Sequence, residues 1–253
     1  MKNILLLNKR TGQTPLECVE EFRKNNPEYK DVRMGYAGRL DPMANGLLLV
    51  LVGKENKKRE QYLGLDKEYE CEVLLGFSTD SYDLLGKTTN VCHAGLDPAS
   101  HQKISNVLQS FIGKQLQQFP PYSSRTVGGE RLYKIAREGR LDAVEIPSKE
   151  IEMYNIELLS ITIIASAELL KTIKDRIAKV HGKFRQTEIV ALWEKTLEND
   201  NKEYPVIKIR ISCSSGTYMR SLANHIGKKL GSNAIALSIL RTKVGNFTFK
   251  DIQ

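Results

Sequence analysis

Cysteine and histidine are scarce and scattered in this sequence of 253 residues. The four cysteines, at positions 18, 71, 92 and 213, form no CxxC pair, and the four histidines show no ligand spacing. Such spacing argues against a disulfide framework and against a zinc site. We therefore expect reduced, mostly structural thiols in a cytoplasmic protein, and no bound metal.

Long apolar runs are missing too. No stretch reaches about eighteen apolar residues, so no membrane-spanning helix is expected, and the apolar run Ile4–Leu7 is too short for a secretory signal. What the sequence has is positive charge, a net +8 with a pI of about 9.2. This surplus favours a polyanion such as nucleic acid as partner, although many soluble proteins are basic. With 41% hydrophobic and 27% charged residues, residues 1–253 are predicted to be globular, as one large domain or one domain with a small appendage.

The segment Met34–Gly53 contains the clearest local pattern. Its apolar run Leu47–Val52 lies between two glycines and predicts a strand buried on both faces. Asp41 precedes this strand, and the following Pro42 restricts the Asp41 backbone to extended geometry. A carboxylate on a stiff loop beside a buried strand is a candidate catalytic group. An Asp-Pro pair is also ordinary turn chemistry, so the pattern alone leaves both interpretations open.

Apolar spacing predicts further elements. Lys67–Phe77 alternates as a strand whose buried face begins with Tyr69, and by pattern alone this is a core tyrosine. Residues 102–112, with Ile112 on the apolar face, follow a helical period. Helices are also predicted from the Thr14 capping pattern, over 166–180 with Leu170 inward, over 187–197, and over 218–230.

Two features point to chemistry beyond packing. Arg220 lies in the first turn of the last predicted helix, where the helix dipole disfavours a cation by roughly 0.3–1 kcal/mol, so a compensating anion is expected nearby. The segment Phe119–Arg140 interleaves tyrosines with arginines and a lysine. Aromatic faces for bases beside cations for phosphates suit RNA binding. Its Pro-Pro and Gly-Gly pairs predict a protruding loop before a short helix.

Together these segments resemble the tRNA pseudouridine synthase B (TruB) family. The family motif GxLDPxAxG matches from Gly38 to Gly46, and the motif GTYxRxL matches from Gly216 to Leu222. The family's thumb segment is similar to residues 118–140, and its loop TDxxDxxG matches Thr79–Gly86. The resemblance covers nearly the whole chain except residues 165–202, which we interpret as an insertion.

The resemblance implies an α+β fold, with a central mixed, mostly antiparallel sheet flanked by helices and a thumb-like insertion. It implies a single catalytic domain without the C-terminal RNA-binding domain that many members carry. The implied activity is isomerisation of uridine to pseudouridine in tRNA, at position 55 of the T loop, on a flipped-out base and without a cofactor. We expect a monomer that binds the T-arm of tRNA.

The resemblance also implies roles for single residues. The family's aspartate nucleophile corresponds to Asp41, the tyrosine that meets the target uracil to Tyr69, and the arginine that pairs with the aspartate to Arg220. Attack at C1′ and proton abstraction at C2′ remain alternatives for the aspartate. Tyr36 stands where the family usually has a histidine. The implied RNA contacts are Lys9, Tyr36, Tyr122, Arg125, Arg131, Tyr133, Tyr218 and Leu240, the last packing beneath the uracil ring.

Two other functions stay open. One is the related guide-RNA-dependent pseudouridine synthase of archaea and eukaryotes, which shares these motifs. The other is a tRNA-binding folding factor in which catalysis is dispensable. The intact set of Asp41, Tyr69 and Arg220 argues against a purely non-catalytic protein.

Overall fold

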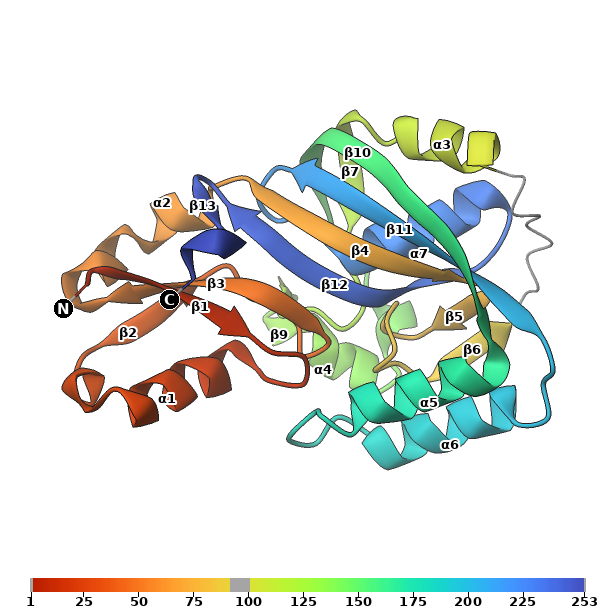
Figure 1. Cartoon of the computed structure of the whole chain (residues 1–253), viewed down its shortest axis with the longest axis horizontal. Coiled ribbons are helices and arrows are strands. Elements are labelled where there is room, and N and C mark those ends of the chain that lie inside the picture. The colour runs from red at the N-terminus through yellow and green to blue at the C-terminus, as the bar shows by residue number, and fades with distance from the viewer. Residues whose placement is uncertain (1, 92–100, 253) are drawn as a thin grey trace.

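The computed structural model of the chain describes residues 2–91 and 101–252. Within these residues nine strands form one twisted sheet (Figure 1). They are β1 (Ile4–Lys9), β2 (Met34–Ala37), β3 (Ala44–Val52), β4 (Lys67–Leu75), β7 (Gly113–Gln118), β10 (Ser148–Ala165), β11 (Glu203–Cys213), β12 (Ala234–Val244) and β13 (Phe247–Thr248).

The main strand order is β1-β3-β12-β4-β11-β10-β7, with β2 pairing β3 and β13 pairing β12. Among these pairs only β12 and β3 run parallel. The sheet is therefore mixed and mostly antiparallel, which confirms the predicted α+β class. Two small hairpins lie outside it, β5 (Phe77–Thr79) with β6 (Thr88–Val91), and β8 (Thr126–Val127) with β9 (Glu130–Arg131).

The helices lie around this sheet (Figure 1). They are α1 (Pro15–Asn25), α2 (Arg59–Leu63), α3 (His101–Gln109), α4 (Leu132–Arg137), α5 (Ser166–Ile177), α6 (Gln186–Leu197) and α7 (Met219–Leu230). One buried cluster joins β4, β11 and β12 to helices α3 and α7, and a second lies beneath α1 against β1 and β3. A third is formed largely by the α5–α6 hairpin, which connects β10 to β11.

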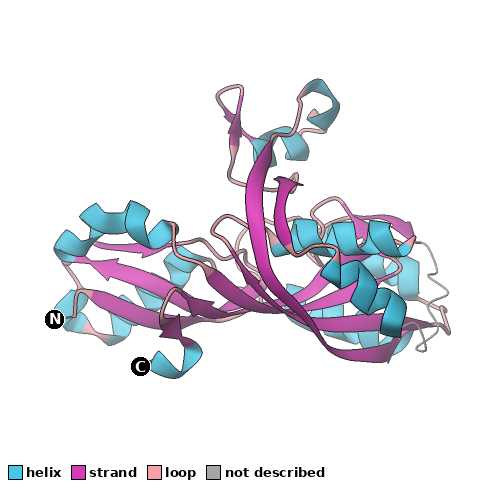
Figure 2. Ribbon diagram, turned by 90° about the horizontal axis from the view of Figure 1, so that it is seen from above, coloured by secondary structure: helices cyan, strands magenta, loops and turns pink. Residues whose placement is uncertain are grey.

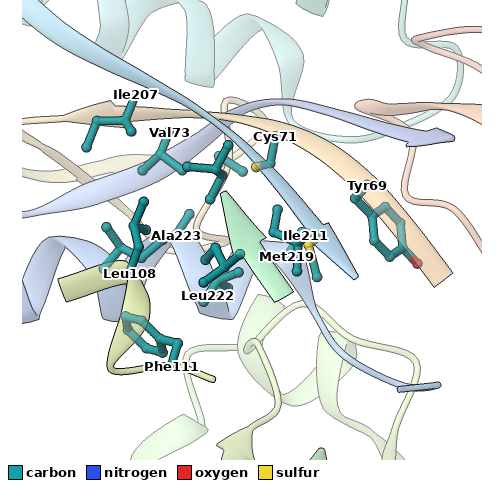
Figure 3. Packing of buried hydrophobic residues seen from close by; sticks show 14 of the residues in the cluster. Tyr69, Cys71, Val73, Leu108, Phe111, Ile207, Ile211, Met219, Leu222 and Ala223 are labelled. Atoms are coloured by element: carbon teal, nitrogen blue, oxygen red, sulfur yellow. The ribbon is translucent and has the colours of Figure 1, made fainter. Parts of the chain in front are cut away.

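The predicted alternation along β4 is confirmed. Tyr69, Cys71 and Val73 are buried and pack against α7 residues such as Leu222 (Figure 3). Tyr69 lies at the edge of this cluster, with its hydroxyl directed away from the other labelled side chains. A strand that is apolar on alternate residues thus delivers a tyrosine hydroxyl to the margin of the core.

Local signals at element ends also behave as predicted, with small differences. Thr14 and Glu17 form a reciprocal capping box at the start of α1. The predicted strand Lys67–Phe77 is broken at Gly76, whose φ of 95° suits glycine and whose N–H bonds to Asn233. At α5 the fully buried stripe runs through positions 169, 173 and 177, and the predicted inward residue Leu170 is only partly buried against the same cluster.

The predicted helix over 102–112 is shorter than expected. It ends at Gln109, and Ile112 is 44% exposed instead of facing the core. Tight turn hydrogen bonds follow the helix, and Gly113 at a φ of 98° turns the chain into β7. Three cysteines, Cys18, Cys71 and Cys213, are buried free thiols; Cys92 lies outside the described residues.

The segment predicted as a thumb does project. The β8–β9 hairpin and α4, at the back of Figure 1, stand away from the body of the molecule in Figure 2. Pro120 and Pro121 at its base are buried, whereas most of its charged side chains are exposed. In the part of the chain that the structure describes, no helix combines the length and the apolar character needed to cross a membrane.

Candidate active site

Asp41 lies in the loop between β2 and β3, with about a third of its side chain exposed. Its carbonyl accepts a hydrogen bond from the Ala44 N–H at 3.0 Å, which closes the turn into β3. The loop lies beside β12 because Gly46 permits a close approach there. A Cβ on Gly46 would lie 2.4 Å from the Arg241 carbonyl oxygen, and its φ of 108° also favours glycine. The motif glycine therefore holds the aspartate loop against the sheet.

Arg220 is buried in the first turn of α7 and points at this loop. Its Nε donates to Asp41 Oδ2 at 2.8 Å, so the predicted salt bridge between distant parts of the chain is present. Nη1 donates to the Ser81 carbonyl at 2.8 Å, and Nη2 donates to the Tyr122 carbonyl at 3.0 Å. Burial disfavours the charged guanidinium, but Asp41 and Asp83 more than offset this and raise the pKa of Arg220.

Asp83 is a second carboxylate at Arg220, and the sequence pattern did not mark it as a site residue. It is 5% exposed and lies 3.7 Å from Arg220 Nε. It also accepts hydrogen bonds from the Ser81 hydroxyl at 2.5 Å and the Leu85 N–H at 3.0 Å. Burial raises the pKa of Asp83, while Arg220 and these hydrogen bonds oppose the shift. The motif TDxxDxxG was the sequence signal for this residue.

Tyr69 enters the same region from β4. It is paired with Arg241 of β12, which is 1% exposed and donates to the carbonyls of Leu47 and Gly38. Burial raises the pKa of Tyr69, Arg241 partly offsets this, and the Asp41 carboxylate raises the pKa further. The phenol is therefore protonated at neutral pH. Arg241 is a further buried cation of the region that the sequence pattern did not reveal.

Asp41 of the β2–β3 loop, Tyr69 of β4 and Arg220 of α7 thus come together, although they are far apart in the sequence. A family model described as TruB family pseudouridylate synthase (N terminal domain) matches residues 26–174. The chain belongs to the TruB family.

Relatives support this assignment over almost the whole chain. The tRNA pseudouridine synthase B of Parabacteroides distasonis is 32% identical over 252 residues, which span 97% of this chain and 86% of the relative. The tRNA pseudouridine synthase B of Bacillus licheniformis is 33% identical over 249 residues, which span 98% of this chain and 67% of the relative. The matches to these relatives extend beyond the match to the family model, which ends at residue 174 within α5.

Solved structures share the fold. The chain matches a crystal structure of a Cbf5-Nop10-Gar1 complex with a TM-score of 0.58 and 22% identity, over 97% of this chain and 49% of that one. The chain also matches a structure of an H/ACA RNP bound to a substrate RNA containing 2′-deoxyuridine, with a TM-score of 0.56 and 20% identity. This match covers 97% of this chain and 48% of that one. The chain spans about half the length of these structures, and at such identity the likeness concerns the fold.

Lys9 does not fit the RNA contact that the family resemblance implies. Its side chain is fully buried, and the ammonium donates to the carbonyls of Arg10, Pro42 and Ala44. Burial lowers its pKa to about 8. The reason is topological, since Lys9 ends β1 directly opposite Gly46 of β3. In this TruB-family chain Lys9 donates hydrogen bonds to the Asp41 loop and so stabilises it, and it is not available to a phosphate.

Leu240 also differs from its predicted place, whereas the RNA contact of Tyr36 stays a prediction. Leu240 pairs with Glu70, whereas its neighbour Arg241 pairs with Tyr69. Side chains alternate along a strand, so Leu240 lies on the sheet face opposite Tyr69 and not beneath a base stacked there. Tyr36 is half-buried against the cluster beneath α1.

The remaining predicted RNA contacts lie around the thumb. Tyr218 occupies the N-cap position of α7 and packs edge-on against Phe119, with ring centroids 5.5 Å apart. Burial raises the pKa of Tyr218, and the nearby Asp41 carboxylate adds to the shift. Tyr122 is half-buried at the thumb base. Arg125, Arg131 and Tyr133 are exposed on the thumb.

The site holds cations that suit an anionic substrate, not a cluster of metal ligands. Across residues 2–91 and 101–252, no three His, Cys, Asp or Glu side chains are grouped so that they could hold a metal ion. Asp41 and Asp83 share one arginine between them. The arrangement orients one partly exposed carboxylate, that of Asp41, beside the buried ring of Tyr69.

Proposed function

We propose that this protein isomerises uridine to pseudouridine in tRNA, at uridine 55 of the T loop. The observation that carries the proposal is the contact between Asp41 Oδ2 and Arg220 Nε at 2.8 Å in a TruB-family chain. Arg220 is 3% exposed, whereas Asp41 keeps a third of its side chain accessible. A carboxylate held by a buried cation but open to solvent is suited to reacting with a bound substrate.

The reaction needs an ionised carboxylate and gains or loses no atom overall. The C1′–N1 bond breaks, the uracil turns, and a C1′–C5 bond forms; C5 loses its proton and N1 takes one up. Asp41 acts either by attacking C1′ or by removing the C2′ proton, and it is regenerated in both cases. The hydrogen bond from Arg220 Nε orients the Asp41 carboxylate toward a bound nucleotide.

Tyr69 fits a stacking role better than a basic one. Burial raises its pKa, so a phenolate that accepts the C5 proton is disfavoured. The ring lies at the edge of the core, with its hydroxyl turned away from the packed side chains (Figure 3). A detached uracil stacked on this ring would keep its place between cleavage and rejoining.

Binding of tRNA is supported by charge and by shape. The chain has a net charge of +8. The thumb stands away from the body of the molecule (Figure 2), and its Arg125, Arg131, Tyr133 and Lys134 are exposed. Cations for phosphates and rings for unstacked bases are the two needs of RNA recognition. The target uridine has to leave its stack to meet Asp41.

The proposal is tested by incubating the pure protein with an unmodified tRNA transcript and mapping pseudouridine. We expect one modified position, uridine 55, without a guide RNA, and no product on a transcript with cytidine at that position. Product that appears only with a guide RNA would favour the guide-dependent synthase instead. Tight tRNA binding without any pseudouridine would favour the folding factor.

A further inference from the structure

The α5–α6 hairpin reaches the active-site region through Arg185. This residue directly precedes α6, with a φ of 65° in the left-handed region, which is uncommon for a side chain other than glycine. Its guanidinium donates to both carboxylate oxygens of Asp80, at 2.8 and 3.3 Å. It also lies over the ring of Tyr122, 4.6 Å from the centroid. An unfavourable backbone conformation is thus retained where one side chain makes three contacts.

In the cluster of Arg185, Asp80 and Tyr122, each side chain contacts the other two. The Tyr122 hydroxyl donates to Asp80 Oδ2 at 3.0 Å, and the Lys87 N–H donates to Asp80 Oδ1 at 2.9 Å. Burial raises the pKa of Tyr122 to about 12, with Asp80 adding to the shift, so the hydroxyl remains a donor. The side chains of Arg185 and Asp80 are 18% and 23% exposed. Such a shielded, bidentate ion pair is more rigid than an exposed one.

Arg220 donates hydrogen bonds to two backbone carbonyls, one of a cluster residue and one of a residue next to the cluster. Its Nη2 donates to the carbonyl of Tyr122, and its Nη1 donates to the carbonyl of Ser81, the neighbour of Asp80. The guanidinium is planar, so fixing both Nη atoms also sets the direction of Nε. Nε is the atom that donates to Asp41.

We propose that Arg185 is a positioning residue for the reaction. By holding Asp80 and Tyr122 it fixes the two carbonyls that orient Arg220, and so it sets the geometry in which Arg220 presents Asp41. The inference rests on the proposed function, and it gives the α5–α6 hairpin a part in catalysis without contact with substrate. Arg185 does not act as an RNA-binding cation, because Asp80 occupies its Nη1 and Nη2.

The test compares Arg185→Ala and Arg185→Lys with the wild type. Single-turnover rates at saturating tRNA are measured separately from the Kd for tRNA. A displacement on the order of 1 Å at reacting groups costs up to about a hundredfold in rate, so we expect Arg185→Ala to lose between about tenfold and a hundredfold. The Kd should change less than about threefold, since phosphate contacts are intact. Lysine cannot bind bidentately and stack, so Arg185→Lys should recover only part of the rate.

Two further variants separate positioning from hairpin stability. Lys174→Gln removes the ion pair with Glu194 within the same hairpin and should keep the wild-type rate. Tyr122→Phe keeps the ring and the carbonyl but removes the hydroxyl that donates to Asp80, and should lower the rate several-fold without unfolding the chain. A wild-type rate in Arg185→Ala, a full recovery in Arg185→Lys, or an equal loss in Lys174→Gln would overturn the proposal.

A second readout does not depend on catalysis. Hydrogen exchange of the Arg220 Nε–H, followed by NMR, reports how firmly Arg220 is held against Asp41. We expect exchange at least about tenfold faster in Arg185→Ala than in Lys174→Gln, because protection follows the free energy of local opening. Equal exchange would overturn the positioning role even if the wild type made no pseudouridine, an outcome that would count against the proposed function alone.

Discussion

At the scale of single residues, the site is organised around the buried guanidinium of Arg220. An arginine that is 3% exposed is tolerated only when its charge and its donors are matched. Asp41 and Asp83 supply the charge, and the carbonyls of Ser81 and Tyr122 supply the remaining acceptors. Because two carboxylates share the arginine, one of them can stay partly exposed for chemistry while the other is buried.

This division of roles leads to a prediction for Asp41→Asn. Asparagine keeps the size but removes the charge and the nucleophile, so pseudouridine formation should fall to background. The free energy of unfolding should drop by only about 1 kcal/mol, because Asp83 still pairs with Arg220. The affinity for tRNA should be retained, since phosphate contacts and stacking dominate it.

The measurements are pseudouridine mapping, a tRNA binding isotherm and urea unfolding. Asp31→Asn, at an exposed aspartate, serves as the control and should leave all three unchanged. Substantial activity in Asp41→Asn would mean that another residue is the nucleophile. Loss of binding in a folded variant would mean that Asp41 organises the RNA site instead.

The buried Lys9 predicts how stability depends on pH. Burial lowers its pKa from 10.5 to about 8. Between these values the unfolded chain binds more protons than the folded chain, so the free energy of unfolding rises with pH. From about pH 7.5 to 9.5 the wild type should gain about 2 kcal/mol more than Lys9→Met.

Urea unfolding at several pH values checks this expectation. Lys67, whose pKa burial also lowers to about 8, should preserve part of the pH slope in Lys9→Met. Lys24→Met, at an exposed position on α1, should match the wild type. A Lys9→Met variant with the same pH slope as the wild type would show that the ammonium is not desolvated.

At the scale of elements, the thumb and the β5–β6 hairpin region meet at α7. Arg220, in the first turn of α7, donates to the Ser81 carbonyl of the hairpin region and to the Tyr122 carbonyl of the thumb. The thumb projects away from the sheet (Figure 2), and its residues Arg125, Arg131 and Lys134 are exposed. The thumb, which we propose binds RNA, and helix α7, which carries Arg220, are thus joined through the backbone carbonyl of Tyr122.

The thumb prediction concerns salt. Replacing Arg125, Arg131 and Lys134 with alanine should remove counterion release at the phosphates that these side chains neutralise. The slope of log affinity against log salt should therefore decrease by about one for each such phosphate, up to about three. Filter-binding titrations over a range of KCl concentrations measure it. Lys228→Ala, in the last turn of α7, should not alter the slope, and an unchanged slope in the triple variant would direct attention to residues 165–202.

At the scale of the whole molecule, we predict a monomer. Among the described residues, the exposed large apolar side chains are spread over several elements, including Leu16 on α1, Leu116 on β7 and Ile163 on β10. Single exposed apolar residues are normal on monomers, and a net charge of +8 opposes self-association. Sedimentation equilibrium should give a mass near 28.6 kDa across the concentration range. A concentration-dependent rise toward twice that mass would contradict the prediction.

What the sequence by itself determined is local or tied to a motif. The capping box of Thr14 and Glu17 predicted the start of α1, because the signal and the structure involve the same few residues. Alternation placed Tyr69 on the buried face of β4. Arg220 lies at a helix N-terminus, where the helix dipole disfavours a cation, so an anion was expected nearby, and Asp41 is there. In each case a rule about neighbouring residues predicted the local feature. The family motif then identified Asp41 as the distant partner of Arg220.

The tertiary structure alone decided the features that depend on strand register and on which loops meet. A one-residue step along β12 separates Leu240 from the face of Tyr69, and no property of Leu240 itself encodes that step. Lys9 is buried because β1 pairs with β3 across Gly46. Arg185 reaches Tyr122 only because the α5–α6 hairpin packs beside the thumb base. These contacts span long sequence separations, so they exist only once the sheet has been assembled.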